Sequence, residues 1–229
     1  MPAQTERAGP WVELLVTLLI PAFVLMQLSD PQRLGPVLAL LLALAFPLSW
    51  GLKDLLARRG VNFFAVLGLV SILLTGGIGL LQLDARWLAV KEAAIPGVLG
   101  LIVVGSAFTR RPLVRLILMS PALMHVERIH AGLAQRGNLA AFEARLRAAT
   151  WMLGGAFLFS AVMNYWLATW IVVSPAGTHE FNEELGRLTL LSYPVIALPS
   201  MLMMVAVLYY LTRAIRELAG LTWTEALRL

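Results

Sequence analysis

Six long apolar stretches restrict what this chain can fold into more than any other feature. They lie near residues 11–28, 35–52, 62–83, 88–108, 150–173 and 188–212. An α-helix needs about 20 apolar residues to cross the hydrocarbon core of a bilayer, which is about 30 Å thick. Backbone groups in lipid must bond within the protein, which favours helices over open sheets. The pattern predicts an all-α, polytopic membrane protein with six transmembrane helices.

The composition points the same way. Of the 229 residues, 59% are hydrophobic and 14% are charged, and the mean hydropathy is +0.80. Soluble domains are closer to half apolar and a quarter charged. The length favours a single transmembrane domain over residues 1–229. The first stretch ends without a small-x-small cleavage site, which predicts a retained helix and not a signal peptide.

Basic residues fix the expected orientation. One set of loops and ends would hold Arg7, Lys53, Arg58, Arg59, Arg110, Arg111, Arg115, Arg128, Arg136, Arg145, Arg147, Arg213, Arg216 and Arg228. The opposite loops hold Arg33, Arg86 and Arg187. Lysine and arginine collect in cytoplasmic loops, so both termini are predicted to be cytoplasmic. This role also explains the net charge of +5, and no nucleic-acid partner is expected.

Residues 109–149 form the one sizeable polar segment. Ser120-Pro121 resembles a helix start, and apolar residues then recur at helical spacing to a break at Gly137-Asn138. We predict amphipathic helices over 121–135 and 139–149 that lie on the inner membrane surface, held by their apolar faces and by anionic lipid. The alternative is a small soluble module that binds another protein.

Lys91 and Glu92 are charged residues inside the fourth stretch. A charge within a span is costly unless it is paired, hydrated or close to the interface. The apolar run that follows covers only about 24 Å of helix, which places both charges near the outer boundary. Adjacent helical residues point about 100° apart, so the two side chains are not expected to share a face. Either both reach the interface, or one faces a polar cavity as a substrate or proton site.

Other candidate residues are uncharged. Asn164 lies near the middle of the fifth stretch, where an asparagine usually bonds to another helix. Thr75, Gly76, Gly77 and Gly79 lie in the outer half of the third stretch. Threonine can bond to its own helix, and the glycines allow either close helix packing or an unwound backbone beside a cavity. Four prolines predict kinks in three helices: these are Pro21, Pro96, Pro194 and Pro199.

No catalytic, cofactor or metal site is predicted. The three histidines fall in expected loops on two different sides, and no paired-carboxylate or nucleophile arrangement can be assembled. Residues 179–184 hold one histidine and three acids that could bind a divalent cation. We favour the simpler interpretation, in which Thr178 caps the last helix and the acids interact with its dipole.

From about Gly76 to Gly186 the chain resembles the intracellular septation protein A family of bacterial inner-membrane proteins. The likeness rests on short motifs spread over roughly half of the chain. They are Gly76-Gly77, Asp84, Trp87, Lys91, Arg111-Pro112-Leu113-Val114, Trp151, Asn164, Asn182 and Gly186. The chain departs from the family at Glu92-Ala93, where the family has a threonine close after the lysine. The resemblance implies a helical inner-membrane protein with a role in septation or the envelope.

The carboxyl-terminal part is similar to a sister group of uncharacterised bacterial membrane proteins, through residues 181–186 and Ser192-Tyr193-Pro194. Some members of that group carry a generic transporter label. Two functions therefore remain open. One is a non-enzymatic protein that supports envelope integrity or septation through membrane lipids and envelope or division proteins. The other is a small transporter that uses the Lys91 and Glu92 region with its kinked helices.

Overall fold

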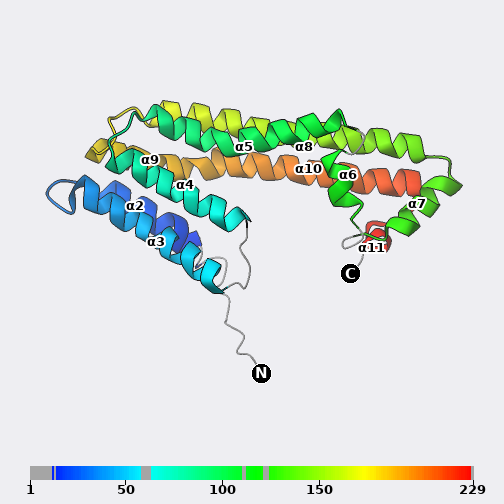
Figure 1. Ribbon diagram of the computed structural model, residues 1–229, viewed down its shortest axis with the longest axis horizontal. Helices are drawn as coiled ribbons and strands as arrows, with labels where there is room; N and C mark the ends of the chain where they lie inside the picture. The colour runs from blue at the N-terminus through cyan, green and yellow to red at the C-terminus, as the bar shows by residue number, and fades with distance from the viewer. Residues whose placement is uncertain (1–11, 13, 58–62, 110–111, 121–123, 228–229) are drawn as a thin grey trace, which may run out of the picture. The chain divides into compact units, whose positions relative to one another are not determined.

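The computed structural model describes residues 12, 14–57, 63–109, 112–120 and 124–227 (Figure 1). Helix makes up 84% of it, and the described ranges hold no strand beyond one isolated bridge between Met124 and Leu227. In chain order the elements are η1 (Leu15–Leu19), α2 (Ile20–Leu28), α3 (Gly35–Ala57), α4 (Phe63–Leu80), α5 (Arg86–Ala107), α6 (Leu113–Leu118), α7 (Val126–Gln135), α8 (Leu139–Ile171), α9 (His179–Ser192), η2 (Tyr193–Ala197), α10 (Leu198–Ala214), η3 (Ile215–Ala219) and α11 (Trp223–Ala226), with η marking π-helical turns. The predicted all-α class is confirmed.

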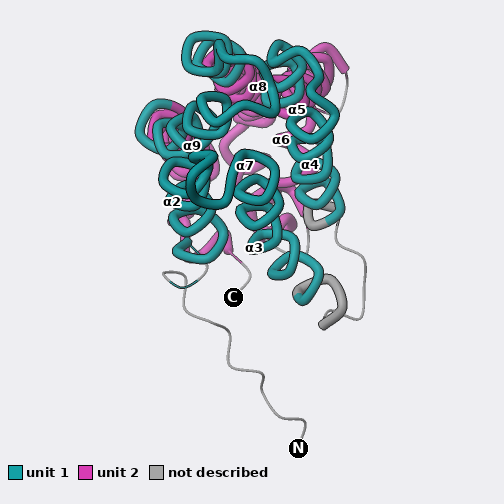
Figure 2. The backbone as a smooth tube through the Cα atoms, turned by 90° about the vertical axis from the view of Figure 1, so that its left-hand side faces the viewer, with its two compact units in different colours: residues 1–92, 164–195 teal, residues 93–163, 196–229 magenta. Residues whose placement is uncertain are grey.

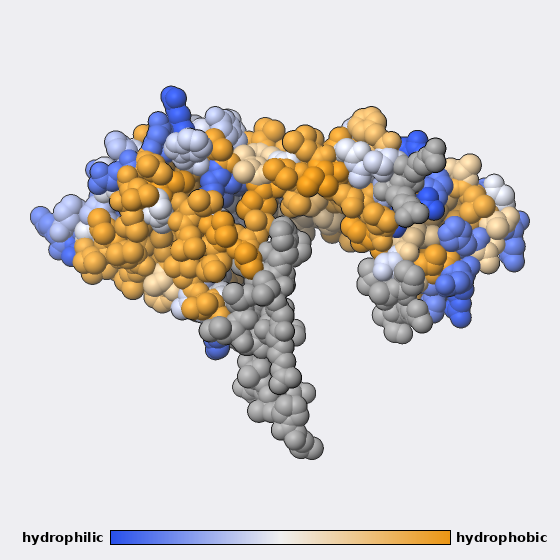
Figure 3. Space-filling model, viewed as in Figure 1, coloured by the Kyte–Doolittle hydropathy of each residue, from blue (hydrophilic) through white to orange (hydrophobic). Residues whose placement is uncertain are grey.

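Among the described residues, four helices are long and apolar enough to cross a bilayer. They are Gly35–Lys53, Arg86–Ala107, Leu139–Ile171 and the run His179–Ala219, and the apolar helices Leu15–Leu28 and Val66–Leu80 are shorter. Large apolar side chains on these helices are exposed, and apolar residues cover broad areas of the face in Figure 3. Soluble monomers rarely expose apolar patches of more than a few hundred Å². The chain is therefore compatible with an integral, multi-pass membrane protein.

The predicted stretches are helical where they are described, but several ends differ. The third was expected to reach residue 83, whereas α4 stops at Leu80 and a turn follows in which Gln82 has a φ of 51°. The second continues past residue 52 to Ala57. Residues 11 and 62, which begin two predicted spans, lie outside the described ranges.

Prolines explain two of the π-helical turns. A proline has no N–H to donate, and its ring clashes with the carbonyl of the residue four positions earlier. For Pro21 that residue is Thr17, inside η1, and for Pro199 it is Val195, inside η2. The wider π turn accommodates both rings. At Pro96 there is no π turn, because α5 continues through it as an α-helix, and a kink there stays a prediction.

The chain divides into two compact units, which Figure 2 distinguishes by colour. One comprises residues 1–92 and 164–195, and the other residues 93–163 and 196–229. In the first unit, α2 packs against α3 and α9, and α3 packs against α4. Its interior includes the fully buried Leu40, Leu88 and Phe181. The single domain remains a prediction.

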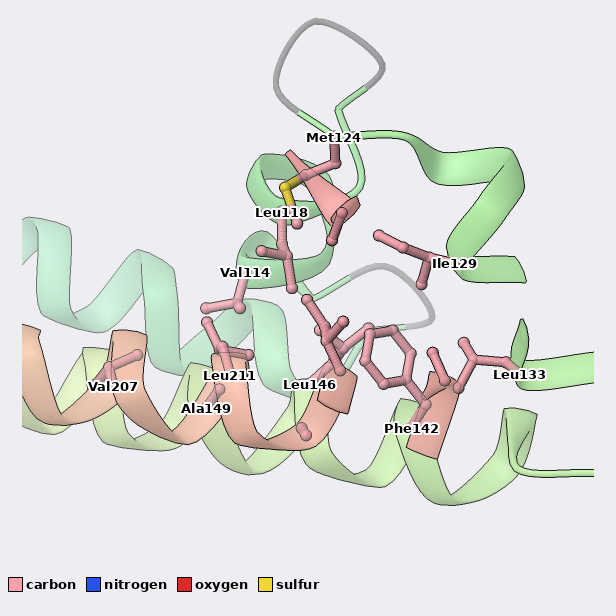
Figure 4. Packing of buried hydrophobic residues seen from close by; sticks show 14 of the residues in the cluster. Val114, Leu118, Met124, Ile129, Leu133, Phe142, Leu146, Ala149, Val207 and Leu211 are labelled. Atoms are coloured by element: carbon pink, nitrogen blue, oxygen red, sulfur yellow. The ribbon is translucent and has the colours of Figure 1, made fainter. Parts of the chain in front are cut away.

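The second unit contains an apolar cluster that extends from the candidate membrane spans into α6, α7 and α11 (Figure 4). It joins α6, α7, the first turns of α8, η3 and α11. Its members include Val114, Leu118, Met124, Ile129, Leu133, Phe142, Leu146, Ile215, Ala219 and Ala226. We call these five segments with their shared core the terminal module.

The terminal module corrects the prediction for residues 109–149. Ile129 and Leu133, the apolar face of α7, have no exposed surface, so protein covers the face that was expected to lie on lipid. The segment 139–149 is helical as predicted, but it is the start of the 33-residue α8 and not a separate helix. The predicted start at Pro121 is also wrong where it can be checked, because Met124 is not helical and α7 begins at Val126. Residues 121–123 lie outside the described ranges.

Candidate functional site

A tight connection between α4 and α5 brings the candidate polar residues together. Backbone amides of Leu81 and Leu83 donate to the last turn of α4. The carboxylate of Asp84 then accepts from the amide of Arg86, 2.8 Å away, and caps α5. Thr75 precedes the end of α4 by five residues, and Lys91 follows the start of α5 by five. Because the helices run in opposite directions, these two positions lie at the same level.

Lys91 has two polar partners at this level. Its ammonium donates to the Thr75 hydroxyl at 2.7 Å and lies 2.7 Å from a carboxylate oxygen of Glu92. The Thr75 hydroxyl in turn donates to the carbonyl of Ser71 at 3.1 Å. That self-bonding of Thr75 was predicted. The hydrogen bond that Thr75 accepts from Lys91 was not predicted.

Burial differs across this ion pair. The Lys91 side chain is 9% exposed, whereas that of Glu92 is 33% exposed. A buried ammonium needs a counter-charge and hydrogen-bond acceptors to offset its lost hydration, and Glu92 and Thr75 supply them. The expectation that the two charges could not share a face is therefore wrong. Their Cβ atoms do diverge, but the long stems let the charged ends meet.

The glycines beside Thr75 divide into two groups. A Cβ on Gly76 would lie 2.8 Å from Leu44, and one on Gly79 would overlap Leu40, so both glycines let α3 approach α4 closely. A Cβ on Gly77 would meet no atom within 4 Å. The α4 backbone remains helical through all three. At two positions, then, glycine serves helix packing, and Gly77 leaves an open surface.

Asn164 was predicted to bond to another helix, and it does interact with a partner. It lies half-buried within α8. The structure thus unites three of the predicted residues, Lys91, Glu92 and Thr75, and leaves the role of Asn164 as a prediction.

A second polar cluster was not predicted as a site. Asn182 on α9 has no exposed surface, and its amide donates to the hydroxyl of Ser29 at 3.1 Å and to the carbonyl of Pro36 at 2.7 Å. Ser29 is equally buried. The cluster ties α9 to the loop after α2 and to the first turn of α3. A buried asparagine far along the chain from its partners carries no local signal, so sequence reasoning could identify it only through the resemblance.

The acidic start of α9 is organised as a helix cap. Thr178 accepts a hydrogen bond from the amide of Phe181 at 3.1 Å, as predicted. Glu184 turns back to accept from the amides of Val173 and Ser174, both at 2.9 Å, and Glu183 pairs with Arg187. Within the described residues, no group of three or more histidine or acidic side chains is placed to hold a metal ion.

Comparisons with family models, curated proteins and solved structures were made for the whole chain. None of the three returns a match.

Proposed function

We propose that this chain is a non-enzymatic protein of the bacterial inner membrane, with six spans and both termini in the cytoplasm. It supports envelope integrity or septation by binding lipids and other envelope proteins. The resemblance to the intracellular septation protein A family motivates the role. The observation that carries it is the terminal module, a folded basic region at the ends of two long helices.

Helix length supports this arrangement. The 33 residues of α8 extend about 50 Å at 1.5 Å per residue, whereas the hydrocarbon core is about 30 Å thick. Trp151 and Trp170 are separated by 19 positions in the sequence, or about 28 Å of helix, and tryptophan favours both membrane interfaces. A span between them leaves residues 139–150 outside the lipid, where they contribute to the terminal module.

Charge places the terminal module on the cytoplasmic side in this proposal. Arg115 pairs with Glu143 at 2.8 Å and Arg213 with Glu217 at 2.5 Å, so some of its arginines are used internally. Others, including Arg128, Arg147 and Arg216, are exposed. An excess of arginine beside spans is retained on the cytoplasmic side. A folded basic surface there suits contacts with acidic partners and anionic lipid.

Deletion of the gene tests this role. We expect the deletion strain to show altered cell shape, delayed septation or increased detergent sensitivity, and the intact gene to restore the wild type. A strain that is normal in all three assays contradicts the envelope role.

A transporter is the second candidate, favoured by the ion pair at Lys91 in a helix that is apolar enough to span. If Lys91 takes part in transport, Lys91→Met should remain folded in the membrane and lose the ability to restore a deletion strain. Thr169→Val is a matched control, because Thr169 is exposed and bonds only to carbonyls of its own helix. A fully active Lys91→Met protein at normal abundance contradicts the transporter.

A further inference from the structure

Helices α5 and α8 pack against each other in antiparallel directions in the second unit. A Cβ on Gly97 would lie 3.7 Å from Ala161, one on Gly100 would lie 2.9 Å from Leu158, and one on Gly154 would lie 2.5 Å from Val104. Residue numbers rise along α5 as they fall along α8. Small residues at these positions let the two backbones approach closely.

Two other glycines lie beside this seam and face open space. Gly105 follows Val104 on α5, Gly155 follows Gly154 on α8, and a Cβ on either would meet no atom within 4 Å. Each glycine is one residue, or about 100°, beyond a seam residue. Seen from one end, the chain of α5 turns in one sense and the chain of the antiparallel α8 turns in the other. The two helices also face each other across the seam. A step of one residue past the seam therefore leads to the same side of the helix pair on both helices. The glycines therefore leave one level of the α5–α8 surface free of side chains, and we call this bare surface the recess.

An aromatic pair borders the recess. Phe108 lies three residues beyond Gly105, in the turn that follows α5, and Trp151 lies one turn before Gly155 on α8. Their rings meet edge to face with centroids 5.1 Å apart. Phe108 is 77% exposed and Trp151 is 45% exposed. Exposed aromatic rings at the end of an apolar helix are typical of the lipid interface.

Arg147 lies one turn before Trp151 and on the same side of α8, because residues four apart share a face. It is exposed, and it has no hydrogen-bond or ion-pair partner in the described part of the chain. Arg145, by contrast, is turned to Tyr210 and Glu217. A guanidinium, an aromatic pair and an open recess thus follow one another along a single stripe.

We propose that this stripe binds one anionic phospholipid. The guanidinium of Arg147 pairs with the headgroup phosphate, because arginine matches phosphate oxygens with two parallel donors. Phe108 and Trp151 contact the glycerol region, and an acyl chain fills the recess at Gly105 and Gly155. The order matches the polarity of a lipid from headgroup to tail. The site rests on the proposed membrane placement and names one of its lipid partners.

Native mass spectrometry of the full-length protein tests the site. The protein is purified in detergent and supplied with phosphatidylglycerol or phosphatidylcholine of the same acyl chains. We expect the wild type to retain phosphatidylglycerol in preference. Arg147→Gln should lower that preference about five-fold, since one basic residue near the surface contributes about that factor. Gly155→Leu should reduce retention of both lipids by filling the recess.

Two controls separate the site from general effects. Arg86→Gln removes the same charge from an exposed arginine of the outer loops, and Gly77→Leu fills another open glycine; both should leave lipid retention unchanged. Equal preference in the wild type and Arg147→Gln overturns the proposal, as does an equal loss in Arg86→Gln. A chain found in the soluble fraction of the cell would contradict the proposed function itself, which is a distinct result.

Discussion

At the scale of single residues, Lys91 is the best-defined ionisable group in an apolar helix. Its charge is balanced by Glu92 and its hydrogen bonding is assisted by Thr75. Because Glu92 is the more exposed member, it can be hydrated when its partner is lost, whereas Lys91 cannot. The loss of the Glu92 charge and the loss of the Lys91 charge should therefore lower the stability by different amounts.

We expect Glu92→Gln to destabilise the protein more than Lys91→Met. Breaking a fully buried pair costs about 3–5 kcal/mol, and the partial exposure of Glu92 should reduce this to about 2 kcal/mol for Glu92→Gln. Lys91→Met leaves only a partly hydrated carboxylate and should cost less. Thermal unfolding of the detergent-solubilised variants measures the order. The double variant should recover much of the loss, and the reverse order of the single variants would contradict this account.

The second prediction for a single residue concerns the buried Asn182. Asn182→Leu leaves the buried Ser29 hydroxyl and the Pro36 carbonyl without their donor, which should cost about 2–3 kcal/mol. The loss should appear as a lower unfolding temperature. An unchanged unfolding temperature would show that water satisfies these groups equally well.

At the scale of elements, the seating of α7 on η3 depends on a close backbone approach. A Cβ on Gly132 would lie 2.5 Å from the carbonyl oxygen of Ala219, and a backbone atom cannot move aside as a flexible side chain can. The amide of Asn138 also donates to the carbonyl of Leu218 at 3.0 Å. These contacts bury the apolar face of α7.

Gly132→Ala should therefore loosen the terminal module. Overpacking of this kind typically costs about 1–3 kcal/mol, and we expect faster hydrogen exchange in α7 and η3. Gly105→Ala is the control, because its Cβ would meet no atom and alanine favours helix by up to about 1 kcal/mol. Slow exchange in Gly132→Ala would contradict the close approach.

Helix α11 should respond to acid. The hydroxyl and amide of Thr222 donate to the Glu225 carboxylate at 2.7 Å and 2.8 Å, and these bonds lower the pKa of Glu225, with a smaller contribution from Arg128. A lowered folded-state pKa stabilises the fold above the usual glutamate value, and this contribution is lost as pH falls through the folded pKa. The protection of residues 222–227 from hydrogen exchange, relative to the intrinsic rate, should therefore fall as the pH drops below the ordinary glutamate pKa of about 4.3. In Glu225→Gln this pH dependence should be absent, and an unchanged profile would contradict the assignment.

At the scale of the whole molecule, the proposed topology assigns each loop to one side of the membrane. The chain contains no cysteine, so single cysteines can report on this without background. Gln32 is exposed between α2 and α3, and Gln135 is exposed at the end of α7. The proposed topology puts the first outside and the second in the cytoplasm.

We expect a membrane-impermeant maleimide to label Gln32→Cys in intact cells and to label Gln135→Cys only after the cells are opened. Labelling of both in opened cells is the control for reactivity. If both react in intact cells, or neither does, the six-span topology is wrong.

The sequence alone determined the class of this protein and the positions of its helices. Apolar runs of about 20 residues leave the backbone few options other than helix, and local signals such as the Thr178 cap act within one turn. For this reason the predicted stretches overlap with α2 to α5, α8 and α9 to α10, although several ends differ. The polar residues Lys91, Glu92 and Thr75 could also be singled out, because charge and hydroxyl groups are unusual within apolar runs.

Only the tertiary structure decided which groups meet. The Lys91–Thr75 bond joins two helices, the Asn182–Ser29 bond joins residues far apart in the chain, and neither has a local signature. The amphipathic pattern of α7 likewise showed that one face must be covered but not by what, since lipid and protein remove apolar surface from water equally well. The approach of η3 at Gly132 settled that choice in favour of protein, because a non-local backbone contact can be read only from the fold.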